Sequence, residues 1–478
     1  MRFSEHFNLG ATQVQLDFVD IPIETDVSLF IDPYALSLED DPWFVGCHEL
    51  LLSYFQLVLD HIRDGGERQA LELLEQLREP NDTHLGYSRA RPAGRGIGSL
   101  QARALYNSLA DSEAVRTGFI QDLSDCELLI SGIGRDKVSD ITINVIKQPL
   151  FEYTARQCAL HGIPVRTVAS GRFWDSSKNR WSQASVDLPI VGNTRIVLVP
   201  KAAVRYESAV TPQRYYNDYI LEYFQAEHIE AGTSLVKTLT TGPRVYKKDL
   251  MPLYPYSKGF LYSFSKDHPG VLNEYRDALL HQAACYLTDQ QIENRQDVPN
   301  DVDYASLTAQ LSQIPLGLSA ASQYHEFATR AVVAAFYPRL YNVVKEQEVN
   351  EGRKRIDLVL NATASPGFFR DLREVHRVKC PYILVECKNF TEDPSNPELD
   401  QLLGRFSDHR GSFGILLCRN VKDKPLMLKR CKDVLNDQKR YILVLDDQDL
   451  TRILGLKAEG KERAVDEYLA ELFRQLVF

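Results

Sequence analysis

Three charged residues stand at unusual places in the C-terminal third of the sequence. Glu386 and Lys388 lie at the end of the apolar run 382–388, Tyr-Ile-Leu-Val-Glu-Cys-Lys. Asp357 lies within the run 355–360, Arg-Ile-Asp-Leu-Val-Leu. Ionised groups inside apolar strands are costly unless they are paired or bind a metal ion. The pattern therefore indicates a polar site shared by two strands.

A divalent metal is the chemistry that these residue types fit. The carboxylates of Asp357 and Glu386 and the backbone carbonyl of Cys387 are hard oxygen ligands of the kind that Mg²⁺ or Mn²⁺ takes. Such a metal lowers the pKa of a bound water and stabilises charge on a scissile phosphate. Lys388 would orient or deprotonate the water, or neutralise the transition state. The alternative is a buried ion network without catalysis.

The hydrophobic pattern of residues 316–478 predicts the elements that hold this site. Helices are expected at 320–337, 396–409 and 424–435, strands at 340–349, 355–360, 382–388, 413–418 and 441–445, and closing helices over 449–478. Glu386 and Lys388 are two apart on a strand and so point to the same face. This order predicts an α/β domain with a mixed β-sheet flanked by helices, interrupted by an insertion at 361–380.

The same residues resemble the motif of the PD-(D/E)XK nuclease superfamily. Asp357 is followed about thirty residues later by Glu386 and Lys388, and Gln401 lies on the next predicted helix. The resemblance covers roughly residues 320–450, and the run that starts at Gly404 looks like the corresponding part of Mrr-like restriction nucleases. It implies a restriction endonuclease-like fold for this domain.

The resemblance also implies roles for individual residues. Gln401 maps onto a supporting catalytic residue of the family, and Glu326 on the first helix maps onto a further metal ligand, with Glu346 and Glu348 as rival carboxylates. Ile356 stands where the family often has proline before the aspartate. The insertion lengthens the usual spacing between Asp357 and the second acidic position.

The function implied is that of a Mg²⁺- or Mn²⁺-dependent endonuclease that hydrolyses phosphodiester bonds in DNA. The family setting implies a bacterial restriction or anti-phage defence role, a homodimer or higher homo-oligomer, and a partner protein of a defence system. Two alternatives stay open. One is an inactive nuclease fold that binds nucleic acid or a partner protein. The other is RNA as the substrate, because the metal site contacts phosphate and not the 2′-hydroxyl.

Two groups of arginines are candidates for phosphate contacts. They are Arg405, Arg410 and Arg419 in the nuclease-like segment, and Arg89, Arg91 and Arg95 in a glycine-rich stretch before a predicted helix. Backbone amides at a glycine-rich helix start, with guanidinium groups nearby, suit a phosphate. The alternatives are solvated surface charges for the first group and a surface loop for the second.

Composition and length set the wider frame. The chain has 478 residues, enough for several domains. We expect a larger α+β N-terminal region at 1–315, a recognition or regulatory region of one or two subdomains, and the nuclease-like domain at 316–478. No apolar run approaches the ~20 residues of a membrane span, and the eight cysteines form no CxxC pair. A cytoplasmic protein without a membrane partner is expected.

The charge is unevenly divided. Residues 321–478 carry 26 Lys and Arg against 24 Asp and Glu, and residues 1–320 carry the other 29 and 41. The net charge of −10 therefore belongs to the N-terminal part, and the nuclease-like part can accept a polyanion.

In the N-terminal part, Trp174 and Trp181 lie in a hairpin-like stretch, where core packing is favoured over base stacking. The run 128–130, Leu-Leu-Ile, reads as a short strand.

Overall fold

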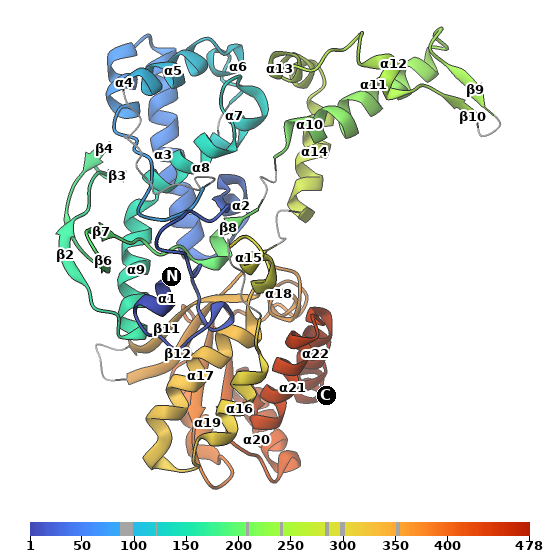
Figure 1. Cartoon of the computed structure of the whole chain (residues 1–478). Coiled ribbons are helices and arrows are strands. Elements are labelled where there is room, and N and C mark those ends of the chain that lie inside the picture. The colour runs from blue at the N-terminus through green and yellow to red at the C-terminus, as the bar shows by residue number, and fades with distance from the viewer. Residues whose placement is uncertain are drawn as a thin grey trace.

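The computed structural model describes residues 1–86, 99–120, 122–206, 210–239, 242–282, 286–296, 302–349 and 354–478. Its buried apolar side chains form two cores. The first gathers residues between Phe3 and Ile292, and the second gathers residues between Tyr304 and Leu476. Val14 packs in the second core and Tyr341 in the first, so each region contributes to the core of the other. Figure 1 shows the N-terminal region, in blue and green, above the C-terminal region, in yellow to red.

The C-terminal region is built on one five-stranded sheet. Its strands are β11 (Leu340–Val349), β12 (Lys354–Ala362), β13 (Tyr382–Lys388), β14 (Phe413–Cys418) and β15 (Tyr441–Leu445), in that spatial order. β11, β12 and β13 pair antiparallel, and β13, β14 and β15 pair parallel. The predicted mixed sheet is confirmed.

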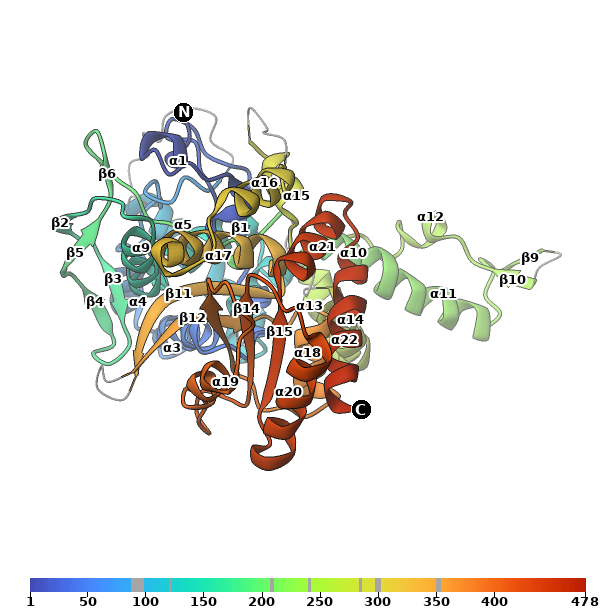
Figure 2. The same cartoon turned by 90° about the horizontal axis from the view of Figure 1, so that it is seen from below.

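Helices cover both faces of this sheet. They are α16 (Ala305–Gln313), α17 (Ala321–Phe336), α18 (Phe368–Glu374), α19 (Asn396–Leu403), α20 (Lys424–Gln438), α21 (Asp447–Ala458) and α22 (Glu462–Val477). α16, α17 and α21 lie on one face, and α19 and α20 lie on the other (Figure 2). α16 precedes residue 316, the expected start of the nuclease-like domain, yet its Leu307 and Leu311 pack in the second core.

Local sequence explains the two helices that flank the candidate site. α17 buries a stripe that includes Tyr324, Ala328 and Val332, the spacing of one helix face. α19 begins with a capping box, in which the Ser395 side chain bonds the first turn and the Glu398 side chain bonds back to the Ser395 N–H at 2.7 Å. This cap fixes where α19 starts over the sheet.

The N-terminal region is mostly helical. Its main helices are α3 (Pro42–Arg63), α4 (Glu67–Leu74), α5 (Ser99–Ala110), α7 (Leu123–Leu129), α8 (Arg135–Val145) and α9 (Lys147–His161). The short strands include β2 (Arg166–Ala169), β3 (Phe173–Asp175), β4 (Arg180–Ser182) and β5 (Ser185–Leu188), which form two-stranded pairs. The expected strand at 128–130 is wrong. Asp122 caps the first turn of α7, and the helix runs through Leu129.

The two tryptophans of the β3–β4 hairpin pack into the protein. Trp174 and Trp181 face each other across the strand pair. Trp174 is fully buried, and its Nε1 donates to Ser53 Oγ at 2.8 Å. Nε1 of Trp181 donates to the carbonyl of Leu73 at 3.0 Å. Core packing, and not base stacking, is what these side chains do.

An arm extends from the body of the molecule. It belongs to the segment that contains α10 (Pro212–Tyr215), α11 (Leu221–Glu230), the hairpin of β9 (Lys237–Leu239) and β10 (Gly242–Arg244), α12 (Lys247–Leu250), α13 (Lys258–Asp267) and α14 (Pro269–Gln282). Within this segment, α13 packs against α7 of the N-terminal region. Both views show α11 and the hairpin projecting away from the sheet (Figures 1 and 2). Near the tip, the charged groups of Lys237, Arg244 and Lys248 lie 5.2, 5.1 and 5.7 Å from the Tyr246 ring centroid.

Carboxylates of the N-terminal region hold the first strands of the sheet. Asp17 accepts the Asn342 N–H at 2.9 Å, and Asp41 accepts the Tyr341 hydroxyl and the Asn361 side-chain amide. These bonds dock the N-terminal region on β11 and β12.

No helix of the described ranges has both the length and the apolar character that crossing a membrane requires.

Candidate active site

Asp357 and Glu386 lie opposite each other where two antiparallel strands part. Leu358 pairs with Val385 at the end of the β12–β13 ladder, so the next step along both strands places Asp357 across from Glu386 on one face. Oδ2 of Asp357 accepts the backbone N–H of Cys387 at 2.8 Å. A side-chain oxygen thus takes the place of a ladder carbonyl, and the Asp357 charge is close enough to raise the pKa of Glu386.

Lys388 and Gln401 complete a hydrogen-bonded cluster around Glu386. Lys388 Nζ lies 3.0 Å from Glu386 Oε1 and 2.9 Å from Gln401 Oε1. The Gln401 side-chain amide donates to the same Oε1 of Glu386. The structure therefore brings together four of the predicted residues, from β12, β13 and α19.

Glu386 is the most buried member of the cluster, and its charge is incompletely compensated. The residue has no exposed surface, and Oε2 is buried without a hydrogen-bond partner within the described part of the chain. Burial raises the pKa of Glu386, and the charge of Asp357 raises it further, whereas the charges of Lys388 and Arg405 lower it. A cation bound at Oε2 would stabilise the negative charge of the carboxylate, which burial deprives of hydration.

The oxygen donors present fit a magnesium-type ion. Glu386 Oε2, the Asp357 carboxylate and the Cys387 carbonyl belong to neighbouring positions where the β12–β13 pairing ends. Among the described residues, no group of three or more His, Cys, Asp or Glu side chains is arranged to hold a metal. Mg²⁺ usually binds through one or two carboxylates and takes its other ligands from water and substrate phosphate. The donor set is therefore one for an ion shared with a phosphate, and not for a closed structural site.

His325 is a site neighbour that the sequence analysis missed. It projects from α17, and its Nε2 lies 3.1 Å from the Cys387 carbonyl oxygen and 3.7 Å from Asp357 Oδ2. The signal that could have found it is its place beside the buried Tyr324 in the first turns of α17. A carbonyl oxygen has two lone pairs, so this bond leaves one for a further ligand.

Glu326, the expected further metal ligand, lies elsewhere. Its side chain is two-thirds exposed and pairs with Arg330 at 3.2 Å, one helical turn along α17, and not with a residue of the cluster. Its helix presents His325 to the site instead. The rival Glu346 is the position across the β11–β12 ladder from Asp357, and its exposed carboxylate lies 3.6 Å from Arg355. The other rival, Glu348, pairs with the same arginine at 3.1 Å.

The C-terminal arginines divide into two kinds. Arg405 and Arg410 are half-buried, the charge of Arg405 acts on Glu386, and Arg410 Nε donates to the Arg405 carbonyl at 2.6 Å. Arg419 is buried and holds structure: it donates to the carbonyl of Ile314 and to Asn389 Oδ1, both at 2.9 Å. Its guanidinium is thus not free for phosphate, contrary to the expectation. Arg89, Arg91 and Arg95 lie outside the described residues.

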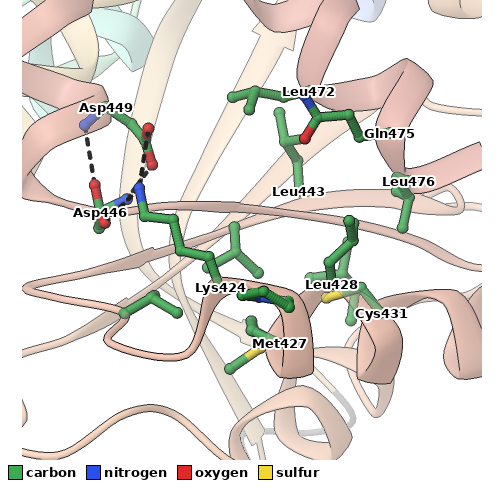
Figure 3. A pocket seen from close by; sticks show the side chains of 14 residues that line it. Lys424, Met427, Leu428, Cys431, Leu443, Asp446, Asp449, Leu472, Gln475 and Leu476 are labelled. Atoms are coloured by element: carbon green, nitrogen blue, oxygen red, sulfur yellow. Dashed lines mark hydrogen bonds and ion pairs between the residues drawn. The ribbon is translucent and has the colours of Figure 1, made fainter.

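A separate pocket of about 310 Å³ lies between α20, β15 and α22 (Figure 3). Apolar side chains such as Met427, Leu443 and Leu476 line it. At one end Lys424 pairs with Asp446 at 2.8 Å and Asp449 at 3.6 Å. Asp446 and Asp449 also form the capping box of α21, so this polar end has a structural role. The pocket shares no lining residue with the cluster around Glu386.

Comparison with known proteins reaches only the N-terminal region. Residues 8–211 match a family described as Domain of unknown function (DUF8370). The match ends just before α10 and contains none of the cluster residues. Searches among curated proteins and among solved structures found no match for the chain.

Proposed function

We propose that this protein is a Mg²⁺- or Mn²⁺-dependent nuclease that cleaves phosphodiester bonds in DNA, with a restriction endonuclease-like C-terminal domain of the PD-(D/E)XK type. The observation that carries the proposal is that Asp357 and Glu386 lie opposite each other where the β12–β13 pairing ends. Lys388 and Gln401 bond to one oxygen of Glu386, and its other oxygen is buried without a partner. The chain order of α17, three antiparallel strands, α19 and a parallel β14 also supports the proposal.

In this proposal Asp357, Glu386 and the Cys387 carbonyl hold the metal. When bound, the ion supplies Lewis-acid stabilisation of the phosphate and lowers the pKa of a water ligand. Lys388 has its ammonium 3.0 Å from Glu386 and can donate to the attacking water or to a phosphate oxygen. Gln401 restrains both side chains and is a positioning residue. His325 holds the Cys387 carbonyl in place from α17.

The wider setting follows from the same proposal. The N-terminal region recognises the substrate or regulates the nuclease domain. The cationic group around Tyr246 on the arm adds a place for a polyanion to bind. A homodimer would let two sites cut both strands of a duplex. A bacterial, cytoplasmic defence effector with a partner protein is the biological role that the family resemblance suggests.

The test is a cleavage assay on single- and double-stranded DNA and RNA, in Mg²⁺, Mn²⁺ or EDTA. The full-length chain is compared with Glu386→Gln and with Glu326→Gln, which neutralises an exposed carboxylate outside the cluster. We expect metal-dependent cutting of DNA by the wild type and Glu326→Gln, and none by Glu386→Gln. Cleavage of RNA but not of DNA would show that the substrate is RNA and not the proposed DNA. Metal-independent binding without product on any polymer would favour the inactive, nucleic-acid-binding alternative.

A further inference from the structure

A cleft of about 590 Å³ lies between the two regions of the protein. α3 and α9 of the N-terminal region form one wall, and β11, β12 and β13 form the other. A volume of this size lies within the range of small-molecule binding sites, roughly 300–1,000 Å³. Because both regions contribute, the cleft exists only when the N-terminal region is docked on the sheet.

The cleft adjoins the candidate active site on the same face of the sheet. Val359 and Leu384, which line it, pair with each other in the β12–β13 ladder. They lie two positions from Asp357 and Glu386 on the same strands, so all four side chains point to one face. Two residues along a strand span about 6.6 Å. A ligand in the cleft would therefore reach the edge of the metal site.

The lining combines flat rings, an apolar floor and cations. The rings of Trp43 and Tyr382 and the side chain of Val359 offer surfaces for a planar group. Arg156 and Arg410 supply positive charge, against the single carboxylate of Glu152 among the lining residues. This is the combination by which proteins bind single-stranded nucleic acid: stacking for a base and guanidinium groups for its phosphate.

Two donors at the cleft lack acceptors. Nε1 of Trp43 and Nε of Arg156 are buried, and neither has a hydrogen-bond partner in the parts of the chain that the structure describes. An Nη of Arg156 makes a long bond of 3.4 Å to Asn342 Oδ1. Buried donors without acceptors are costly. These two atoms have almost no exposed surface, so an acceptor of the ligand reaches them only if the side chains turn toward the cleft, and the unmet hydrogen bonds favour that turn.

We propose that this cleft binds one nucleotide unit, with its base against Trp43 and Tyr382 and its phosphate toward Arg156 or Arg410. The nucleotide has two possible sources. It can belong to the strand being cut, in which case the inference rests on the proposed nuclease function and makes the cleft a specificity pocket. It can also be a free nucleotide, which would occupy the cleft as an effector.

Gly46 provides a variant that fills the cleft without disturbing the fold. It lies within α3 and lines the cleft, and a Cβ built there meets no atom within 4 Å. Gly46→Leu therefore places a side chain in open space and gains helix propensity. Gly46→Ala is the smaller matched variant. Gly455→Leu makes the same change at an equally open position of α21, away from the cleft.

The experiment measures binding by the full-length chain in EDTA, so that no strand is cut. A labelled short single-stranded DNA is followed by fluorescence anisotropy, and AMP and dAMP are followed by quenching of tryptophan fluorescence. We expect Gly46→Leu and Arg156→Gln to weaken binding about tenfold or more. We expect Gly46→Ala and Gly455→Leu to bind with an affinity close to that of the wild type. Loss confined to DNA assigns the cleft to the substrate strand, and loss of AMP or dAMP binding assigns it to a free nucleotide.

Binding of every probe at wild-type strength by Gly46→Leu, or no binding of any probe by the wild type, would overturn the inference. The same variants are also assayed for Mg²⁺-dependent cleavage. A wild type that binds through the cleft but never cuts would contradict the nuclease proposal and support nucleotide binding in the cleft. A Gly46→Leu variant that binds and cuts as the wild type does would contradict nucleotide binding in the cleft but not the nuclease proposal.

Discussion

The carboxylate of Asp357 accepts the backbone N–H of Cys387, with 2.8 Å between oxygen and nitrogen. This bond gives Asp357 a structural role beside its proposed role as a metal ligand. Asp357→Ala leaves a buried N–H without an acceptor, and we expect the free energy of unfolding to fall by about 1–3 kcal/mol. Asp357→Asn keeps an acceptor oxygen, so its free energy of unfolding should fall much less. Both variants should lose cleavage activity. Denaturant unfolding distinguishes them, and equal losses of stability would contradict this role.

Arg419 should matter for stability and not for nucleic acid. Its buried guanidinium pairs with Asp447 at 2.9 Å and bonds the carbonyls before α17. Arg419→Ala leaves these groups without their donor and should lower the free energy of unfolding by about 3 kcal/mol. Lys422→Ala removes an exposed pair with Glu392 and should cost less than about 1 kcal/mol. A thermally stable Arg419→Ala variant that has lost DNA affinity would reverse the assignment.

Docking of the N-terminal region should depend on pH through Glu39. This carboxyl accepts the Ala364 N–H at 2.8 Å, and burial raises its pKa from 4.5 to about 7. Because the folded chain holds this proton more tightly than the unfolded chain, the stabilisation is complete below pH 4.5 and is lost as the pH rises through about 7. Glu39→Gln should therefore melt above the wild type at pH values beyond 7, with the difference closing toward pH 4.5.

The neighbouring Asp40 provides the control for that measurement. It is exposed and pairs with Arg373 at 2.8 Å. Asp40→Asn should shift the melting temperature little at any pH, because exposed ion pairs contribute little. If the difference between Glu39→Gln and the wild type were the same at every pH, the Glu39 carboxyl would not be the titrating group.

His325 is expected to tune metal binding without being essential to it. Its ring nitrogen lies 3.1 Å from the Cys387 carbonyl, one of the proposed metal ligands. Partners of metal ligands typically contribute about 10–100-fold to metal affinity or activity. His325→Ala should raise the Mg²⁺ concentration needed for half-maximal cleavage by about tenfold. The maximal rate should change less, and an unchanged Mg²⁺ requirement would remove His325 from the site.

Much of the C-terminal sheet could be predicted from the sequence, for identifiable reasons. The strands at 382–388, 413–418 and 441–445 are mostly apolar, and Asp357, Glu386 and Lys388 stand out because apolar residues flank them in the sequence. Pairing in the ladder then brings those charges together. The Gln401 position followed from the family resemblance and lies in the cluster.

Other features depend on contacts that a linear pattern does not contain. Glu326 and His325 are neighbours on α17, and only the crossing of that helix over the sheet decides which one faces Cys387. Arg419 looks like a surface charge until the loop before α17 closes over it. The cleft beside the site needs α3 and α9, which come much earlier in the chain than the strands they face.

The initial rate of plasmid nicking in Mg²⁺ tests the central claim most directly. The wild type is compared with Asp357→Asn, because asparagine keeps the acceptor for Cys387 but removes a charged metal ligand. We predict Mg²⁺-dependent nicking by the wild type that EDTA abolishes, and a rate at least about a hundredfold lower for Asp357→Asn. Equal rates for the two proteins, or no nicking by the wild type in Mg²⁺ or Mn²⁺, would contradict a metal-dependent nuclease site at Asp357 and Glu386.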